Sequence, residues 1–468
     1  MSNTIKSIIK VALSNVIGIV GGIIVGFIVP KMMEVESYGY YKTFTLYSTY
    51  LSLCHLGIID GIVLKYGGID YDNLNKKVLR GTFKWYLLVH FFFTCVLLIV
   101  AVALPSTKLK FIVFALALNA VFLNVTGYYQ QISQITQRFS ELSFRKILQS
   151  VLTILLTLSL FLAFLNGVSV RYQHYISGVL LINAALSLWY IYTYQDLIFG
   201  NSCTLKETKK EVLSDITVGA PLLIANMCGT LILTLDRQFV SVLYDKATYA
   251  VYAFAYNMLS LVTVATSAIS TVLYPALKRT QLEDIGKISN SLVSVILIFV
   301  FLGMIVYYPL CAFVLWFLPK YAESLPIFRI IFPGLAISSA ITVVMHNIYK
   351  AIGKNNMFFK KSIITLFVSF LANVLAYSLF KTTTSISIAS VITMAMWYAI
   401  VEKDLVVIYS TNPWRNRVYL ALMVIAFYLA SSFSSILIGG IVYLFAALTT
   451  TLIIFWRERT KIINALSK

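Results

Sequence analysis

The chain has 468 residues, of which 59% are hydrophobic and 12% are charged, and its mean hydropathy is +0.86. Soluble domains are about half apolar and about a quarter charged, so this composition argues against a soluble protein and favours one that lies within a bilayer. The formal net charge of +19 would suit nucleic acid, but the charges are distributed along the chain as a membrane topology requires, which argues against that partner.

About fourteen apolar stretches are long enough for a transmembrane helix, which takes roughly 20 residues. They predict an all-α integral membrane protein with spans at about 11–30, 44–66, 83–104, 111–131, 147–166, 175–195, 216–244, 249–275, 288–308, 323–349, 361–380, 383–401, 415–433 and 435–456. A further apolar segment, 307–318, contains Pro309. We expect it to lie along the membrane interface instead of extending the ninth helix.

Basic residues set the orientation of these spans. With the N-terminus in the cytoplasm, all but ten of the 37 lysines and arginines fall in the inner loops and tails, as the positive-inside rule requires. The exceptions are Lys31, Lys42, Lys108, Lys110, Arg171, Arg237, Lys246, Lys320, Arg329 and Lys381. Both termini are therefore predicted to be cytoplasmic. The five cysteines form no CxxC pair, and we expect no disulfide framework, metal site or cofactor.

An internal repeat divides the chain. Segment 32–41 and segment 243–252, offset by 211 residues, each follow the first helix of a half, and the matching pairs are Glu34 with Asp245, Ser37 with Thr248, Tyr38 with Tyr249 and Tyr41 with Tyr252. We interpret this as two parallel six-helix bundles, 1–200 and 211–405, followed by an additional helix pair, 415–456. Such repeats suit a transporter whose site lies between the halves. Chance similarity of tyrosine-rich interfacial loops is the alternative.

Several segments, in order, resemble one family: 30–41 after the first helix, 56–61 in the second, Leu235 to Phe239 in the seventh, 320–326 before the tenth and 349–354 after it. They resemble the polysaccharide flippases (of O-antigen or capsule repeat units) in the multidrug, oligosaccharidyl-lipid and polysaccharide exporter superfamily. The resemblance implies a V-shaped, alternating-access transporter in the bacterial inner membrane. Its cargo would be an undecaprenyl-pyrophosphate-linked oligosaccharide, carried from the inner to the outer leaflet.

The seventh predicted helix carries a polar stripe at helical spacing, formed by Asn226, Thr230, Thr234, Arg237 and Ser241. Such a stripe should face a water-filled cavity or another helix, because an arginine at membrane depth is unfavourable by about 2.5–3.5 kcal/mol. A guanidinium can bind a pyrophosphate or an acidic sugar through two hydrogen bonds. Arg237, Asn226, Thr230 and Thr234 are therefore candidate substrate-binding residues. The alternative for Arg237 is an interhelical salt bridge.

Other charged residues give weaker candidates. Arg329 precedes Pro333 and either reaches the cavity or extends to water at the interface. Lys31 and Lys42 flank the first outer loop and either line the cavity mouth or are solvated. Asp236 points away from Arg237, because neighbouring helix residues do not face each other. It is a candidate cation or proton site, with a structural ion pair as the alternative. Asp60 lies about two turns from the inner end of the second helix and is a second ion-coupling candidate. The alternative is that it is close enough to water to have no special role.

Two other functions remain open. A cation-coupled drug or small-molecule antiporter of the same superfamily should have acidic groups in its cavity. A membrane glycan polymerase or ligase needs catalytic groups on a large outer loop, and the sequence offers no catalytic candidate there. The chain lacks a GxxxxGK[ST] sequence, so we expect H⁺ or Na⁺ coupling, or the membrane potential, instead of direct use of ATP. We expect a monomer, near the glycosyltransferases and glycan polymerase of its pathway.

Overall fold

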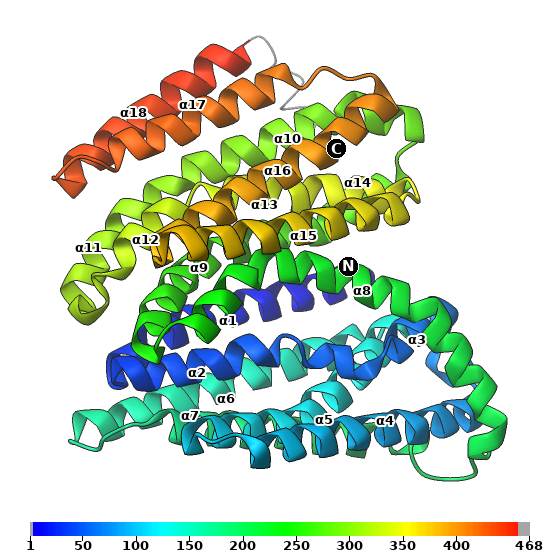
Figure 1. Ribbon diagram of the computed structural model, residues 1–468. Helices are drawn as coiled ribbons and strands as arrows, with labels where there is room; N and C mark the ends of the chain where they lie inside the picture. The colour runs from blue at the N-terminus through cyan, green and yellow to red at the C-terminus, as the bar shows by residue number, and fades with distance from the viewer. Residues whose placement is uncertain (1–2, 457–468) are drawn as a thin grey trace. The chain divides into compact units, whose positions relative to one another are not determined.

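The computed structural model describes residues 3–456, and within them it leaves out the side chains of residues 3–12, 260–268, 271, 272 and 275. The described chain is all-helical and contains no strand (Figure 1). Ten of its helices are long and apolar enough to cross a membrane, or twelve when each of two bent helix pairs is counted as one span. The protein is therefore a multi-pass membrane protein.

All fourteen predicted spans coincide with helices, but two of them fall outside that set of twelve. One is α17, Trp414–Ala430, which has 17 residues, and the other is α9, Lys246–Arg279, part of whose side chains the structure does not describe. The prediction of about fourteen spans is thus matched in helix positions. By length and apolar composition, ten to twelve of them qualify among the described residues.

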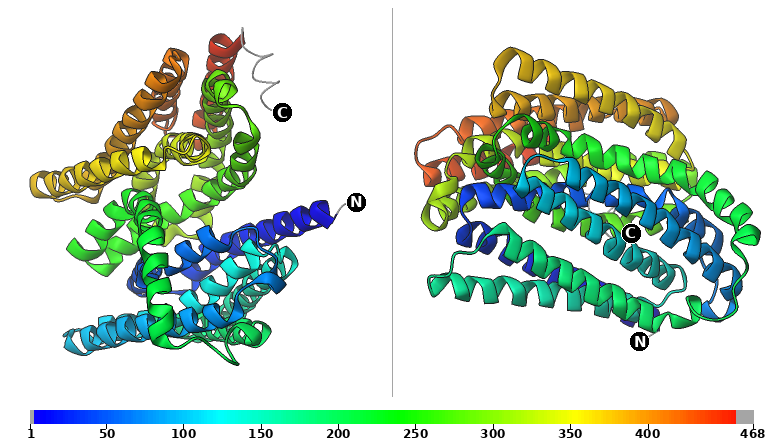
Figure 2. Two further views of the ribbon diagram at one scale, coloured as in Figure 1. Left: turned by 90° about the vertical axis from the view of Figure 1, so that its right-hand side faces the viewer. Right: turned by 60° about the horizontal axis from the view of Figure 1, so that its bottom comes forward.

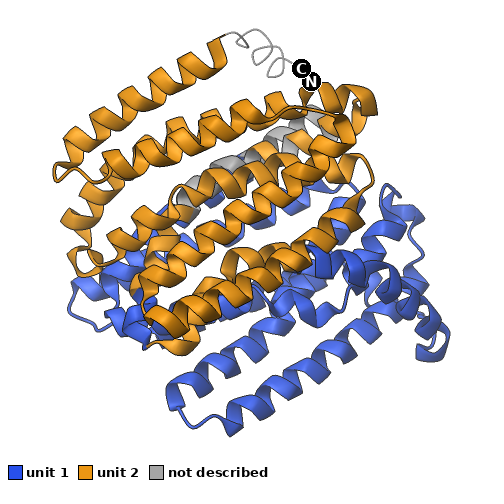
Figure 3. Ribbon diagram, turned by 45° about the horizontal axis from the view of Figure 1, so that its top comes forward, with its two compact units in different colours: residues 1–227, 245–250 blue, residues 228–244, 251–468 orange. Residues whose placement is uncertain are grey.

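The chain divides into two units (Figure 3). Unit 1 comprises 1–227 and 245–250, and unit 2 comprises 228–244 and 251–468. The boundary at Met227 and Cys228 falls inside the long helix α8, Leu205–Leu243, and α9 begins in unit 1 and continues in unit 2. The two six-helix bundles and the additional helix pair remain a prediction.

In unit 1, α1 packs on α6 and α5 packs on α7, each pair running parallel, and α5 also packs on α4 in the antiparallel direction (Figure 2). Its elements before α8 are α1 Asn3–Met32, α2 Val35–Ser48, η1 Leu51–His55, α3 Ile58–Tyr66, η2 Tyr71–Asn73, α4 Lys76–Ala103, α5 Thr107–Ile135, α6 Phe139–Leu165, α7 Tyr172–Thr193 and η3 Gln195–Leu197.

In unit 2, α15 packs on α16, α12 packs on α16, and α17 packs on α18. Its elements after α9 are α10 Leu282–Gly303, η4 Met304–Val306, α11 Tyr307–Phe317, η5 Pro319–Tyr321, α12 Ser324–Ile331, α13 Gly334–Ser339, the π-helical turn η6 Ala340–Met345, α14 His346–Ala351, α15 Asn355–Phe380, α16 Thr383–Tyr409, α17 and α18 Ile436–Phe455.

The segment 307–318 extends the ninth span, so the expectation that it lies along the interface is wrong. Residues Leu282–Phe317 qualify together as one apolar span. Helix α11 directly follows the turn η4, and Pro309 is its third residue. Proline is tolerated in the first turn of a helix, where the missing N–H has no intrahelical partner to lose.

The second predicted span, 44–66, is broken. The helical segments Val35–His55 and Ile58–Tyr66 meet at 61°. Leu56 and Gly57 between them have φ values of 52° and 87°, in the left-handed region that ends a helix. Asn124 of α5 donates a hydrogen bond to the Leu51 carbonyl at 3.0 Å beside this break. Helix α8 approaches so closely that a Cβ at Gly219 would overlap the Gly57 carbonyl oxygen.

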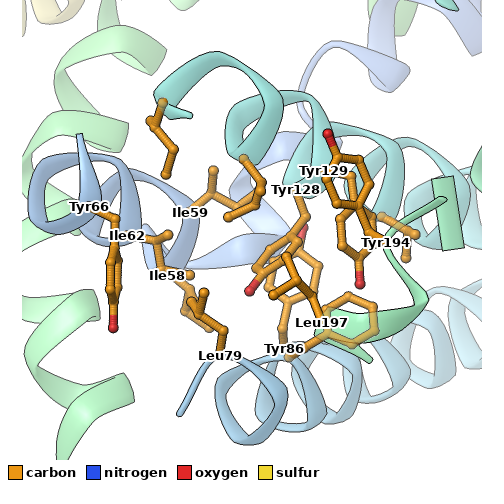
Figure 4. Packing of buried hydrophobic residues seen from close by; sticks show 14 of the residues in the cluster. Ile58, Ile59, Ile62, Tyr66, Leu79, Tyr86, Tyr128, Tyr129, Tyr194 and Leu197 are labelled. Atoms are coloured by element: carbon orange, nitrogen blue, oxygen red, sulfur yellow. The ribbon is translucent and has the colours of Figure 1, made fainter. Parts of the chain in front are cut away.

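A cluster of tyrosine and aliphatic side chains packs α3, α4, α5 and η3 together at one end of unit 1 (Figure 4). Tyr86, Tyr129 and Tyr194 are fully buried in it. The rings of Tyr129 and Tyr194 stack with centroids 5.2 Å apart. This packing fixes the end of α5, whose preceding turns face the helix break.

Beside this cluster, Asp196 of η3 ties the connecting segments of unit 1 together. Its carboxylate accepts hydrogen bonds from Tyr71 and from Lys76, each at 2.7 Å, while Arg80 donates to its carbonyl at 2.9 Å. Burial opposes ionisation, but the hydrogen bonds from Lys76 and Tyr71 outweigh it and lower the pKa of the Asp196 carboxyl. The carboxylate is therefore favoured in the folded protein.

Candidate functional site

Asp236, late in α8, is the most deeply buried of the predicted site residues, at 1% exposure. Its Oδ2 accepts hydrogen bonds from the hydroxyl of Tyr252, at 2.8 Å, and from that of Tyr256. The two tyrosines are one helical turn apart on α9, so both phenols meet one carboxylate oxygen. On α16, Ser387 and Ser390 are hydrogen-bond partners of the phenols. This gives a buried carboxylate surrounded by hydroxyl groups.

Arg237 contacts the same cluster through the ring of Tyr256. Its Cζ lies 4.5 Å from the ring centroid, a cation–π distance, and its Nη2 donates to the Leu233 carbonyl at 2.5 Å. Its Nε is buried without a hydrogen-bond partner among the described residues. The ion pairs of the described residues do not include Arg237, so the alternative of an interhelical salt bridge is not found there.

The rest of the polar stripe on α8 is unevenly covered. Asn226 is exposed, Thr230 is half-buried and Thr234 is buried at 7% exposure. Thr234 Oγ1 donates to the Thr230 carbonyl at 2.8 Å, which satisfies its hydroxyl within the helix. The stripe thus becomes covered towards Arg237, and a role of these three residues in substrate binding stays a prediction.

Arg329 of α12 contacts the C-terminal end of α17. Its Nε donates to Ser431 Oγ at 2.8 Å, and its Nη2 donates to the Tyr428 carbonyl at 2.9 Å and to Ser432 Oγ at 2.5 Å. The last carbonyls of a helix lack intrahelical partners and carry partial negative charge, which favours a cation. The structure thus gives Arg329 a contact with a helix end that the sequence did not indicate, and its role in substrate binding stays a prediction.

The lysines of the first half lie on helices, and Lys42 is not beside a loop as expected. Lys31 is in the last turn of α1, and Lys42 lies inside α2 with its Nζ 5.3 Å from the ring centroid of Tyr38. Tyr249 donates a hydrogen bond to the Lys42 carbonyl at 3.3 Å. Tyr38 and Tyr249 are matching residues of the repeat and are each 1% exposed. Within unit 1, segment 32–41 therefore packs against residues 245–250, so closely that a Cβ at Gly39 would overlap the Lys246 carbonyl oxygen.

Asp60 lies in the first turn of α3, next to the helix break, with its Oδ2 3.8 Å from His55 Nδ1. It belongs to unit 1, whereas Asp236 belongs to unit 2. The two ion-coupling candidates thus have separate surroundings: hydroxyl groups around Asp236 and a histidine near Asp60. Their roles in ion coupling stay predictions.

Tyr252 and Tyr256 are the residues that sequence reasoning missed. Both tyrosines donate a hydrogen bond to Asp236, and the ring of Tyr256 also contacts Arg237. The available signal was a pair of tyrosines four residues apart in an apolar helix. Buried tyrosine hydroxyls usually find a hydrogen-bond partner, and of the acids on the preceding helix Asp236 is the nearest to them in the sequence.

The sequence model of the family described as "Polysaccharide biosynthesis protein" matches residues 4–281, more than half of the chain. The chain belongs to this family. The match includes α8, with Asp236 and Arg237, and it confirms the resemblance inferred from the sequence motifs. No curated protein matches the sequence significantly.

Among solved structures, the fold is similar to that of "Lipid II flippase MurJ, inward closed conformation", with a TM-score of 0.70, 14% identity and coverage of 97% of this chain and 99% of that one. A structure described as that of "a MOP superfamily transporter from Pyrococcus furiosus" has a TM-score of 0.56 at 14% identity, covering 89% of this chain and 96% of that one. The structure "MATE in complex with MaD3S" has a TM-score of 0.55 at 14% identity, covering 87% and 97%. These likenesses show a transporter fold, as the sequence predicted.

Proposed function

We propose that this protein is a flippase that moves undecaprenyl-pyrophosphate-linked oligosaccharide repeat units from the inner to the outer leaflet of the bacterial cytoplasmic membrane by alternating access. The family match over residues 4–281 carries the proposal, and the fold shared with a lipid II flippase supports it. The protein works in the inner membrane with both termini in the cytoplasm, as a monomer near the glycosyltransferases and the glycan polymerase of its pathway.

In this proposal Arg237 binds the anionic head group. A guanidinium offers five N–H donors in a planar fork that suits phosphate oxygens. The Tyr256 ring stacks against Arg237. The Nε of Arg237 is buried and has no hydrogen-bond partner among the described residues. A pyrophosphate oxygen would supply that partner. Asn226, Thr230 and Thr234 would hydrogen-bond the head group or its first sugar.

In the same mechanism, Asp236 is the residue that binds the coupling ion. A carboxylate oxygen that two phenols already bind can also accept a proton or contribute to a Na⁺ site. Because Tyr256 contacts both residues, a change of charge at Asp236 would alter the stacking surface of Arg237. This connection would link ion binding to head-group binding.

A flipping assay with proteoliposomes tests the proposal. Purified full-length protein is reconstituted with a labelled lipid-linked repeat unit, and the label that reaches the opposite leaflet is measured. We expect translocation above that of protein-free vesicles, and a loss of at least about tenfold in Arg237→Ala, the effect of losing a charge-assisted hydrogen bond of about 1.5–3 kcal/mol. Lys403→Ala, which removes an exposed cation from α16, should be unaffected.

Two results would contradict this proposal. Translocation equal to that of protein-free vesicles would reject the flippase function, and full activity of Arg237→Ala would remove that residue from the site. The second candidate function, a cation-coupled antiporter, is favoured by the buried carboxylate of Asp236. It predicts that deletion of the gene lowers resistance to cationic dyes and leaves surface glycan unchanged.

A further inference from the structure

A cavity of ≈ 220 Å³ with both polar and apolar lining residues lies beside the helix break of unit 1. Residues of both arms of the bent span line it, and α5 closes its other side. Its polar lining includes Ser48, Ser52, His55, Asp60, Asn124 and Gln131. A water molecule occupies about 30 Å³ in the liquid, so this cavity has room for a small ion together with several waters.

Asp60 is the charged residue of this cavity. Its Oδ2 is buried and accepts no hydrogen bond from the described residues. Lys65, one turn further along α3, forms an ion pair with Glu211 instead. Among the described ion pairs, the contact of Asp60 is with His55, at 3.8 Å. A buried carboxylate oxygen without a donor is unfavourable unless something binds it.

His55 does not supply the missing donor. Its Nδ1 lies 3.1 Å from the backbone N–H of Gly57 and accepts that hydrogen bond. The neutral ring can have a proton on only one nitrogen, so the geometry assigns that proton to Nε2. The atom of His55 that faces Asp60 therefore presents a lone pair, and two electron-rich atoms face each other at 3.8 Å. A cation between or beside them would remove this repulsion.

The donor atoms decide the kind of cation. Carboxylate, hydroxyl and amide oxygens suit hard cations, and the cavity has one carboxylate, three hydroxyls (those of Ser48, Thr49 and Ser52) and two side-chain amides. A single negative charge matches a monovalent ion better than Ca²⁺, whose sites commonly contain several carboxylates. Among the described residues, groups of three or more histidines, cysteines or acids that could hold a metal are absent, which argues against a transition metal.

We infer that this cavity binds a monovalent cation of the sodium type through Asp60, with Ser48, Ser52, Asn124 and Gln131 and retained water completing its coordination. The site uses a discontinuous transmembrane helix, an arrangement that transporters use for ion binding. The ion would contact residues on both sides of the break at Leu56 and Gly57. The inference concerns binding alone and does not depend on the lipid cargo or on Asp236.

Direct binding of ²²Na⁺ to the purified full chain in nanodiscs tests the inference, with choline chloride keeping the ionic strength constant. We expect saturable binding, and a loss of at least about tenfold in affinity at this site in Asp60→Asn, since even indirect partners of a metal ligand change affinity by roughly 10–100-fold. Ser52→Ala, which removes one oxygen and keeps the charge, should give a smaller loss. Asp72→Asn, an exposed acid of η2, serves as the matched control.

Asp236→Asn separates this site from the coupling group of the proposed function, and it should leave the Asp60-dependent binding in place. Gel filtration and thermal unfolding confirm that each variant is folded. If folded Asp60→Asn binds sodium with the stoichiometry and affinity of the unaltered protein, the inference is wrong. If Asp60→Asn does not fold, Ser52→Ala and Gln131→Leu are measured instead. Unchanged sodium binding in both variants then overturns the inference. Flipping activity enters none of these measurements.

Discussion

At the scale of single residues, the sequence identified the charges in the spans but not their partners. The position of Arg237 in an apolar helix is visible in the sequence, whereas its stacking on Tyr256 depends on how α9 packs against α8. Likewise, the contact of Arg329 with the end of α17 joins residues about 100 positions apart. Hydropathy and helical spacing contain no information on such pairs, so these partners could not be predicted.

The carboxylate of Asp196 gives a pH-dependent prediction. Its pKa is lowered in the folded protein, so its stabilising effect is present above the pKa of the unfolded chain, near 3.9, and is lost as the pH falls through the folded value. Asp196→Asn should therefore lower the free energy of unfolding at pH 7 and have a smaller effect as the pH falls below about 4. Because the side chain is 39% exposed, we expect about 1 kcal/mol or less.

Thermal unfolding in detergent at a series of pH values measures this effect. Asp72→Asn, which changes an exposed acid in the neighbouring η2, should change the midpoint little at any pH. A difference between Asp196→Asn and the unaltered protein that stays constant from pH 7 to about pH 3.5 would show that the ionised form is not what stabilises the fold.

At the scale of elements, hydropathy located the fourteen helical spans, but some of the helices begin well before the predicted position. Helix α2 begins at Val35, nine residues before the predicted span, and α8 begins at Leu205, eleven residues before it. Apolar stretches mark only the part of a helix that lies in the hydrocarbon core. The polar turns beyond it remain helical because their backbone hydrogen bonds are satisfied in the same way. The break at Leu56 was missed because it interrupts an apolar run.

The contact of α3 with α8 gives a prediction about two glycines. A Cβ at Gly219 would overlap the carbonyl oxygen of Gly57, whereas a Cβ at Gly22 in α1 would meet nothing within 4 Å. Gly219→Ala should therefore destabilise the protein by about 1–3 kcal/mol, as overpacking does. Gly22→Ala should be neutral or stabilise it by up to about 1 kcal/mol, since alanine is the better helix former.

Midpoints of thermal unfolding for the two variants, purified side by side, provide the measurement. Both substitutions add one methyl group to a glycine inside a helix, so propensity is matched and only the surroundings differ. Equal midpoints for Gly219→Ala and Gly22→Ala would mean that the backbones of α3 and α8 can separate without loss of stability.

At the scale of the whole molecule, the topology predicted from basic residues can be tested with single cysteines. In a variant without the five native cysteines, Val168→Cys lies in the exposed connection of α6 and α7, which is predicted to be outside, and Asp72→Cys lies in η2, which is predicted to be inside. A membrane-impermeant maleimide should label Val168→Cys in intact cells and Asp72→Cys only after lysis. The opposite pattern would place both termini outside.

The family and the transporter fold could be predicted from the sequence, because motif order and apolar periodicity are properties of the chain itself. The unit boundary within α8, at Met227 and Cys228, could not. It depends on which helices pack together, and no change in composition marks it, since α8 runs unbroken from Leu205 to Leu243. Gly229 directly follows the boundary, but the helix continues through it, so this glycine does not mark the division.

The membership of residues 245–250 in unit 1 has a consequence for biogenesis. A ribosome that has delivered residues 1–227 to the translocon has not yet made the segment that contains Tyr249, whose hydroxyl binds the Lys42 carbonyl. The first unit can therefore reach its final packing only after α8 has been inserted and the chain has turned back into α9. A gene fragment cut after α7 would produce an incomplete first unit.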